Sequence, residues 1–488
     1  MAHASPSSPA TTSSNGRAAS ADEIRRVFEA QKAYQSTART ADAAQRSAKI
    51  ERIRQAVFDR RQDIRDAVYA DFKKAPEEVD LSEIKIIAEF AAFAQKNLAD
   101  WMTPDKVGTP RTFIGTRSEI HYEPKGVVLI ISPWNYPFNL TLAPLISALA
   151  AGNCAILKPS EYTPHSARLL NEMIGELFDE REVALFEGDK TVAQTLLKQP
   201  FDHIYFTGSP AVGRKVMKAA ADHLASVTLE LGGKSPTIVD ETADIEDAAR
   251  KIAWGKFTNT GQTCIAPDYV LAHERIHDQL VDALRDNIQS FYGRSAEAQR
   301  TSPDYARIVD DRHFRRVQKL YADALDDGAR LAAGGDTDAA EQYIAPTLLT
   351  DVPRDTEVMH EEIFGPLLPI LTYRTLDEAL DLINSKPNPL TLYLFTDSRA
   401  TEDTILQRTK AGNTCINDTL VNYFNPYLPF GGAGYSGIGK GHGVFGFKEF
   451  SNERAVLRRT AGSAIMKMLY PPYHKTKRTV IDWLVKYL

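Results

Sequence analysis

The sequence is poor in cysteine, and it has no long apolar run and no excess of basic charge. Three cysteines in 488 residues cannot form a disulfide framework, which indicates a reducing compartment and at most one reactive thiol. The formal net charge of −6 leaves no basic field for nucleic acid. Because the apolar stretches are far shorter than a bilayer span, we expect a cytoplasmic protein without a membrane anchor.

The chain does contain a regular alternation of strand-like and helix-like segments. Short apolar runs at 127–131, 155–157, 183–186 and 203–206 are separated by segments with helical spacing. This pattern predicts an α/β fold built from parallel, doubly wound, Rossmann-like sheets. The chain is too long for one hydrophobic core, so at least two domains are expected.

The domain boundaries follow from changes along the chain. Residues 1–20, rich in Ala, Ser, Thr and Pro, lack the features of a signal or transit peptide and are interpreted as a disordered tail. The remaining divisions are a helical N-terminal layer (21–110), a small extended β arm without an obvious partner in its own domain (111–125), a nucleotide-binding domain (126–231), a second α/β domain (232–421), a C-terminal return with a bridging strand (422–460) and a C-terminal tail (461–488).

A tight turn follows the strand expected at 203–206. Gly208 precedes Ser209, which is placed to cap a helix whose first residue is Pro210, and Gly213 closes the turn. A helix N-terminus at the carboxyl edge of a parallel sheet would face a phosphate. Two Gly-x-Gly-x-x-Gly patterns, at 432–437 and 441–446, are interpreted as a loop, because neither follows a strand or opens a plausible helix.

One of the three cysteines has a distinctive setting. Cys264 ends the small, polar stretch 259–264, where a thiol could be exposed to a ligand and its thiolate stabilised. Cys154 and Cys415 each lie beside an apolar run and are assigned to packing.

Two other polar residues are candidates by position alone. Glu230 follows a strand expected at 227–229, where catalytic groups of α/β domains collect, although it could equally be a surface charge. Asn135 lies between two prolines and is either a turn residue or an amide that donates to a developing oxyanion. Chemistry alone does not decide between these readings.

Several motifs, taken together and in their order, resemble the aldehyde dehydrogenase superfamily over residues 21–459. They are Pro133-Trp134-Asn135, Lys158-Pro159-Ser160-Glu161, Phe206-Thr207-Gly208-Ser209, Leu229-Glu230-Leu231-Gly232-Gly233-Lys234, Gly261-Gln262-Thr263-Cys264, Glu361-Glu362-Ile363-Phe364-Gly365-Pro366 and Pro429-Phe430-Gly431-Gly432. The segments 264–268, 436–439 and 442–443 resemble the class 3 group, which includes fatty, aromatic and coniferyl aldehyde dehydrogenases.

The resemblance implies a covalent mechanism for oxidising an aldehyde to a carboxylic acid. Cys264 would attack the aldehyde carbon, while the amide of Asn135 and the backbone N–H of Cys264 hold the oxyanion. Hydride would pass to a nicotinamide and leave a thioester, and Glu230 would act as general base on the water that hydrolyses it.

The same resemblance implies NAD as cofactor, with NADP possible, and no metal. Residues 126–231 would form the NAD(P)-binding domain and 232–421 the catalytic domain. Lys158 and Glu161 would meet the adenosine ribose, and the turn from Gly208 and Ser209 to Gly213 would lie at the pyrophosphate. Glu362 would hold the nicotinamide ribose with Phe364 nearby.

The substrate and the assembly are less constrained. Tyr136, Thr263, Tyr423 and Phe424 are expected to line a substrate tunnel suited to an aromatic, coniferyl-type aldehyde or to a medium- or long-chain one. A homodimer is expected, because class 3 relatives are commonly dimers and because the segments 111–122 and 454–458 could pair between subunits as an oligomerisation arm.

Two other functions are compatible with the same resemblance. In a CoA-acylating aldehyde dehydrogenase a thiol would take the acyl group, a step that does not require the base Glu230. A catalytically silent structural protein could share the fold, but it would not need Cys264, Asn135 and Glu230 together.

Overall fold

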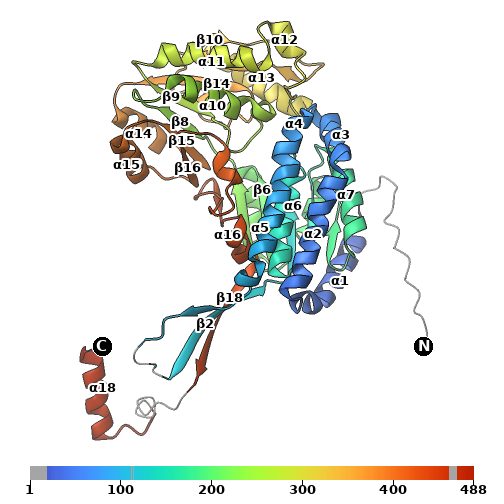
Figure 1. Ribbon diagram of the computed structural model, residues 1–488, viewed down its shortest axis with the longest axis vertical. Coiled ribbons are helices and arrows are strands. Elements are labelled where there is room, and N and C mark those ends of the chain that lie inside the picture. Colours follow the sequence, from blue (N-terminus) through green and yellow to red (C-terminus); the bar gives the residue numbers. More distant parts are fainter. Residues whose placement is uncertain (1–18, 111–112, 114, 461–469, 488) are drawn as a thin grey trace, which may run out of the picture.

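The computed structural model describes residues 19–110, 113, 115–460 and 470–487. Almost all of the expected N-terminal tail (1–20), the start of the expected arm (111, 112 and 114) and residues 461–469 and 488 of the expected C-terminal tail lie outside the described residues. Two α/β units lie one above the other, and a narrow three-stranded sheet projects from the lower one (Figure 1).

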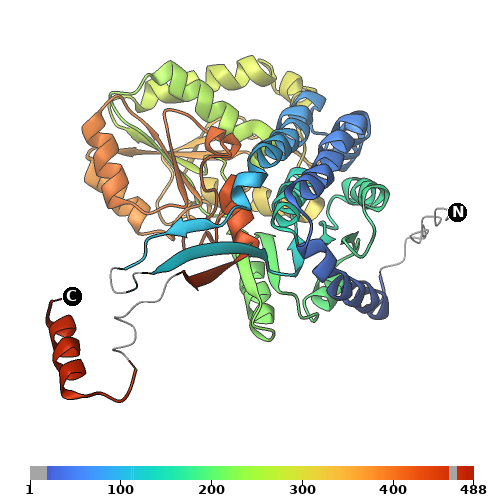
Figure 2. The same ribbon diagram turned by 60° about the horizontal axis from the view of Figure 1, so that its bottom comes forward.

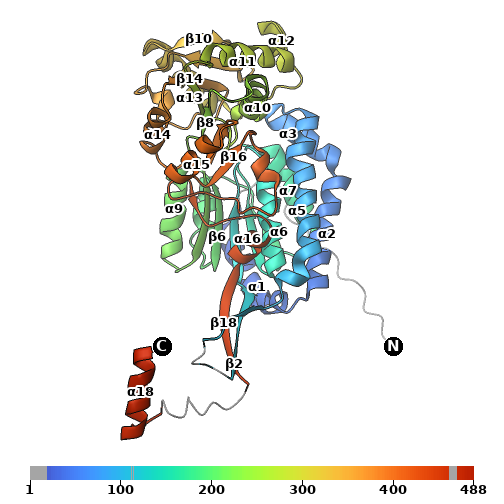
Figure 3. The ribbon, with the colours of Figure 1, turned by 60° about the vertical axis from the view of Figure 1, so that its left-hand side comes forward.

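The first unit contains a six-stranded sheet of order β17-β7-β6-β3-β4-β5. Its strands are parallel except for the edge strand β17. Figure 3 shows α9 on one side of this sheet and α5 and α6 on the other. The elements are β3 (Val127–Ile131), β4 (Cys154–Lys158), β5 (Val183–Leu185), β6 (His203–Gly208), β7 (Ser226–Leu231), β17 (Gly437–Ile438), α1 (Ala21–Arg39), α6 (Asn139–Ala151), α7 (Pro164–Leu177), α8 (Lys190–Leu196) and α9 (Pro210–Ala221).

The strands of this sheet are apolar on both faces because each face is covered by helices. Alternate residues of β3 point to opposite sides: Val128 and Ile130 pack with α5, α6 and α7, whereas Val127 and Leu129 pack with α1, α8 and α9. Burial on both faces explains why these strands appear in the sequence as continuous apolar runs.

The expected N-terminal layer (21–110) is divided between the two faces of the sheet: α1 packs beside α8 and α9 on one face, and the remaining helices of the layer cover the other. They are α2 (Ala43–Asp59), α3 (Arg61–Phe72), α4 (Pro76–Val79), the π-helical segment η1 (Asp80–Lys85) and α5 (Ile86–Trp101). The expectation of helix as far as residue 110 does not hold at its end, because Asp105–Val107 forms the strand β1.

The second unit contains a seven-stranded sheet of order β10-β13-β14-β9-β8-β15-β16, parallel except for β10. Two such parallel sheets with helices on both faces confirm the predicted α/β class. The elements are β8 (Pro236–Val239), β9 (Tyr269–His273), β10 (Arg330–Ala333), β13 (Thr347–Thr350), β14 (Leu367–Tyr373), β15 (Thr391–Phe395), β16 (Asn413–Ile416), α10 (Ile245–Phe257), α11 (His277–Tyr292), α13 (Asp311–Asp326), α14 (Leu376–Asn384) and α15 (Arg399–Arg408), with α12 (Ala296–Arg300) and the pair β11 (Thr337–Asp338) and β12 (Tyr343–Ile344) beside them.

The projecting sheet joins segments that are far apart in the sequence. The strand β2 (Thr116–Pro124) pairs with β1 on one side and along its whole length with β18 (Ser451–Arg459) on the other. The extended arm therefore does have a partner in its own chain, contrary to the expectation, because the bridging strand returns to it.

Two features of the C-terminal region differ from the sequence interpretation. The helix α16 (Gly443–Glu449) begins inside the second glycine-rich pattern, which was expected to be a loop. Lys475–Tyr487 of the expected tail forms the helix α18, which lies apart from the rest of the molecule (Figure 2). Across the described ranges, no helix combines the length and the apolar character that a membrane span requires.

Candidate active site

Glu230 lies near the end of β7, at the carboxyl edge of the first sheet. Its side chain is 6% exposed and accepts a hydrogen bond from the hydroxyl of Tyr205 on the neighbouring strand β6. Burial raises the pKa of Glu230 to about 7 and the charge of Glu449 adds to this, while the Tyr205 hydroxyl and Lys440 act in the opposite direction. A carboxyl group with this pKa can take up and release a proton near neutrality.

Cys264 is carried by a strained loop after α10. The three successive residues Asn259, Thr260 and Gly261 all have positive φ angles, of 52°, 55° and 74°. This conformation is unfavourable for a β-branched residue such as Thr260 and persists only where the surroundings impose it. At Gly261 a side chain could not fit, because a Cβ atom there would lie 2.3 Å from the carbonyl oxygen of Gly365.

Gln262 supplies much of that constraint. Its buried amide donates to the carbonyl oxygens of Asn259 and Arg307, both at 3.0 Å, and its Oε1 accepts the backbone N–H of Val309 at 3.0 Å. The sequence analysis gave Gln262 no role beyond its place in a polar turn. Nothing in its neighbouring residues indicates partners that lie more than forty positions further along the chain.

The Cys264 side chain is partly exposed, as expected, but the pKa of its thiol is raised, which is the opposite of the thiolate stabilisation expected from its polar neighbours. Burial raises its pKa, and the charges of Glu362 and Glu230 raise it further, whereas the backbone N–H groups of Cys264 and Ile265 act in the opposite direction. The sequence showed polar residues before the cysteine but not the two carboxyl groups that face it. Ionisation of the thiol therefore requires a nearby proton acceptor.

The loop that carries Asn135 is tied directly to the loop that carries Cys264. Asn135 Nδ2 donates to the carbonyl oxygen of Gln262 at 2.9 Å, and Asn259 Nδ2 donates to the carbonyl oxygen of Asn135 at 2.9 Å. One residue further on, the hydroxyls of Tyr136 and Thr263 lie 2.7 Å apart. The structure thus brings Asn135 and Tyr136 beside the two residues that precede the cysteine.

Candidate cofactor residues gather at the carboxyl edge of the first sheet. Lys158 ends β4; its buried Nζ donates to the carbonyl oxygen of Pro159 at 2.7 Å and lies 3.5 Å from Glu161 Oε2. Ser209 caps α9 by accepting the N–H of Val212, and Pro210 is the first residue of that helix. The phosphate-binding turn predicted from the sequence therefore has the expected strand, cap and helix.

Two glycines of this turn allow close packing. A Cβ at Gly208 would lie 2.7 Å from the ring of Phe206, and one at Gly213 would lie 2.7 Å from the side chain of Leu231. The absence of a side chain at Gly213 lets α9 pack directly against Leu231 of β7, and Gly208 leaves room for the Phe206 ring of its own strand.

Glu362 and Phe364 approach from the second unit. A Cβ at Gly232 would lie 2.1 Å from Glu362 Oε2, so the carboxyl group rests directly against backbone. Burial raises the pKa of Glu362 to about 8, with Asp268 adding to the effect and the N–H of Gly233 opposing it. Phe364 has a positive φ of 45° and its ring meets that of Trp134 edge to face at 5.3 Å.

The sequence analysis missed the residues that hold this last loop. Asp268 Oδ1 accepts the backbone N–H of Ile363 at 3.1 Å, and Asp268 also forms a buried ion pair with Lys234. Lys234 Nζ donates to the carbonyl oxygen of Glu361 at 3.0 Å. Both residues stood within the motifs of the sequence, but their pairing depends on contact between separate segments.

A cavity of about 30 Å³ adjoins Glu230, roughly the space of one water molecule. Tyr423, expected in a substrate tunnel, contributes to the lining, whereas Phe424 contacts Tyr423 from outside it. Tyr136 and Thr263, the other two expected tunnel residues, lie together on the Cys264 side. The sequence analysis did not include the aromatic side chains that complete the lining, among them Phe90, Trp101 and His442.

Comparisons with known proteins identify the family of the chain. A model of the aldehyde dehydrogenase family matches residues 2–456. The 4,4'-diaponeurosporen-aldehyde dehydrogenase of Staphylococcus aureus is 44% identical over 89% of this chain and 93% of its own. Aldehyde dehydrogenase family 3 member B3 of Mus musculus is 41% identical over 92% of both chains.

A solved structure shows the same likeness. The structure of Staphylococcus aureus AldH in a substrate-bound state matches with a TM-score of 0.89 at 42% identity, and the match covers 94% of this chain and 99% of the AldH chain.

Proposed function

Because this chain belongs to the aldehyde dehydrogenase family and is similar to its class 3 members, we propose that it oxidises an aldehyde to a carboxylic acid through a thioester on Cys264. One observation carries the proposal. The charges of two buried carboxyl groups, Glu230 and Glu362, reach the Cys264 thiol, and the amide of Asn135 is bonded to the same loop. A nucleophile, proton acceptors and an oxyanion donor therefore meet in one place.

In the first step the thiol loses its proton to an ionised carboxyl group beside it and the sulfur bonds to the aldehyde carbon. The carbonyl oxygen becomes an oxyanion, which the backbone N–H of Cys264 stabilises together with Asn135. One N–H of the Asn135 amide is already bonded to Gln262, which holds the group in place, and an amide has a second N–H to donate.

In the second step the carbon is oxidised and then released. The family uses NAD(P), whose nicotinamide, when bound, accepts a hydride from this carbon so that a thioester remains on Cys264. Water then attacks the thioester and passes one proton to Glu230; the bond between the carbon and the Cys264 sulfur breaks, the carboxylic acid leaves, and the proton on Glu230 returns to the Cys264 thiolate. The cavity beside Glu230 is large enough for such a water.

Substitution of the nucleophile and of the base should have different effects. Cys264→Ala should abolish aldehyde oxidation and leave NADH binding intact, because the thiol bonds the substrate and not the cofactor. Glu230→Gln should still release a burst of NADH and then turn over slowly, because the burst precedes water attack. Stopped-flow absorbance of NADH measures the burst and the subsequent turnover of each variant.

The pH dependence of turnover provides an internal control. The base must be ionised and its pKa is about 7, so wild-type turnover should rise as the pH increases through 7, and Glu230→Gln should lack this rise.

Cys154→Ala and Cys415→Ala serve as controls and should stay active, since both thiols are buried and have no role in the proposed mechanism. Turnover of Cys264→Ala within tenfold of wild type would refute the mechanism.

The residues at the sheet edge fit NAD better than NADP. The Glu161 carboxylate can accept hydrogen bonds from ribose hydroxyls, whereas it would repel the additional phosphate of NADP, and Lys158 only partly compensates at 3.5 Å. Glu161→Gln should therefore narrow the ratio of kcat/KM between NAD and NADP, by roughly tenfold if the repulsion is near 1.4 kcal/mol. A wild-type preference for NADP, or an unchanged ratio, would contradict this assignment.

Aromatic side chains around Glu230 support an aromatic, coniferyl-type aldehyde or a medium- to long-chain one as substrate. Phe90, Tyr423 and His442 form one contacting aromatic cluster beside the cavity. Burying apolar surface contributes about 0.8 kcal/mol per methylene, so coniferaldehyde or decanal should exceed acetaldehyde in kcat/KM by at least about tenfold. Equal values across this panel would show that the cluster does not select the substrate.

We also propose a homodimer assembled through the projecting sheet. The strands β2 and β18 extend beyond the body of the molecule (Figure 1), and among the described residues β18 is an edge strand of its sheet, with mostly exposed side chains apart from Ser451. Unpaired strand edges readily add a further strand from another subunit. Light scattering at micromolar concentration should give twice the chain mass, and Ala455→Pro should reduce it, because alternate residues of β18 direct their N–H groups away from β2 and proline removes one of these donors. A monomeric wild type would refute the dimer.

A further inference from the structure

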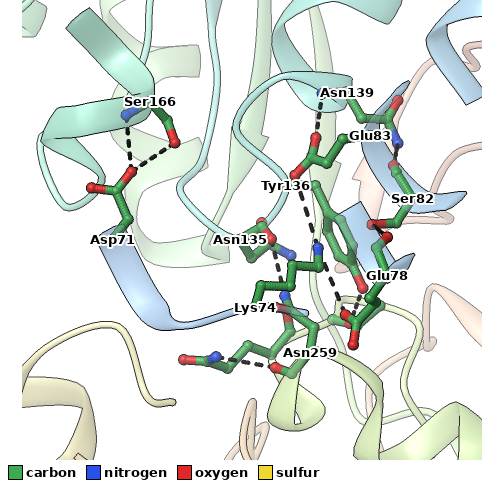
Figure 4. A network of polar contacts seen from close by, with 12 residues as sticks. Asp71, Lys74, Glu78, Ser82, Glu83, Asn135, Tyr136, Asn139, Ser166 and Asn259 are labelled. Atoms are coloured by element: carbon green, nitrogen blue, oxygen red, sulfur yellow. Dashed lines mark hydrogen bonds and ion pairs between the residues drawn. The ribbon is translucent and has the colours of Figure 1, made fainter. Parts of the chain in front are cut away.

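A charged cluster is buried behind the nucleophile, in the connection between α3 and α5. Lys74 Nζ lies 3.8 Å from Glu78 Oε1 and 3.9 Å from Glu83 Oε1 (Figure 4). The side chains of Lys74 and Glu83 are fully buried and that of Glu78 is 19% exposed. Within the described residues, Lys74 Nζ has no hydrogen-bond partner, so these two carboxyl groups provide its charge compensation.

Such a cluster is not explained by stability alone. Removing an ammonium and two carboxylates from water costs several kcal/mol per ion, and apolar residues of similar volume are often as stabilising. The role of the cluster is therefore sought in the residues that its three charged groups contact.

The carboxyl groups reach both loops of the active site. Glu83 Oε2 accepts the backbone N–H of Asn139 at 2.7 Å, at the start of α6 and four residues after Asn135. Burial raises the pKa of Glu78, while the charge of Lys74 and the backbone N–H of Asn259, the first residue of the strained turn, act in the opposite direction. Glu83 thus holds the loop of Asn135, and Glu78 faces the loop of Cys264.

The π-helical segment η1 helps to place Glu83. Its wider turn is rare, and such segments occur often at functional sites. The carbonyl oxygen of Ser82 in the same segment accepts a hydrogen bond from Asn139 Nδ2 at 3.1 Å. Figure 4 shows Ser82 and Glu83 meeting Asn139 from the same helix.

The ammonium itself contacts a residue next to the nucleophile loop. Lys74 Nζ lies 3.9 Å from the centroid of the Tyr136 ring, within the range of a cation–π interaction that is strong when desolvated. The hydroxyl of that ring pairs with Thr263, the residue before Cys264. A continuous set of contacts therefore leads from Lys74 to the nucleophile.

We propose that Lys74 is a positioning residue for Cys264. It keeps Glu78 and Glu83 at the spacing that holds the two loops, and its contact with the Tyr136 ring fixes the hydroxyl that orients Thr263. Lys74 acts through these residues and does not touch the reacting atoms. The assignment rests on the proposed role of Cys264 as nucleophile.

The test compares two lysines of the same region. Lys74→Met removes the buried ammonium but keeps most of the apolar stem, whereas Lys85→Met removes an exposed lysine paired with Glu89 on the helix surface. Lys74→Met should slow the NADH burst by about tenfold or more and leave the Kd for NADH within twofold, because the cofactor edge is untouched. Lys85→Met should change neither.

A double variant separates positioning from general damage. In Lys74→Met/Glu83→Gln the excess negative charge is relieved, and the glutamine oxygen can still accept the N–H of Asn139. The burst rate of this double variant should be at least about threefold higher than that of Lys74→Met. Should Lys74→Met fail to fold, Tyr136→Phe replaces it, and its burst should also slow because Thr263 loses its partner.

The outcomes that overturn the proposal are distinct from those that refute the mechanism. A folded Lys74→Met, or Tyr136→Phe in its place, with a burst rate within twofold of wild type overturns it. The proposal is also overturned if a titration of the burst amplitude shows that the whole loss of activity comes from a smaller number of active molecules. No NADH formation by wild type with any aldehyde of the panel refutes the thioester function; iodoacetamide alkylation of Cys264 then tests positioning alone, with at least a threefold rate change expected for Lys74→Met and an unchanged rate overturning it.

Discussion

The hydrogen bonds between two loops hold the candidate active site together. Asn135 and Asn259 each donate to the other loop, one to the carbonyl oxygen of Gln262 and the other to that of Asn135. These bonds, with the bonds of the Gln262 side chain, maintain a turn in which three successive residues have positive φ. If the loops separated, the strain in that turn would be released and the thiol would move away from Asn135, the proposed oxyanion donor.

Burial determines the acid–base chemistry at this junction. The same desolvation that raises the pKa of the Cys264 thiol also raises the pKa of Glu230 to about 7 and that of Glu362 to about 8. The raised pKa favours the protonated thiol, while the pKa values of the two carboxyl groups lie near neutral pH, where these groups can exchange protons. Reactivity then depends on substrate and cofactor entering the site.

The two α/β units contribute different parts of the same site. The first sheet provides Glu230, the loop of Asn135 and the edge with Lys158 and Ser209. The second provides Cys264 and the loop of Glu362, held by the Lys234–Asp268 pair. Lys74 and its carboxylates lie where these parts meet, which explains how a residue far from the reacting atoms can affect the nucleophile.

The sequence by itself determined the fold class and marked the candidate residues of the site. Strands buried on both faces leave apolar runs, a helix cap leaves Ser-Pro after a strand, and the ordered motifs mark Asn135, Glu230 and Cys264; all of these are local signals. Only the tertiary structure decided which charges face the thiol, that β2 pairs with β18, and that Gln262, Asp268 and Lys74 hold the loops. Those properties depend on desolvation and on contacts between distant segments, and neither leaves a periodic or local pattern in the chain.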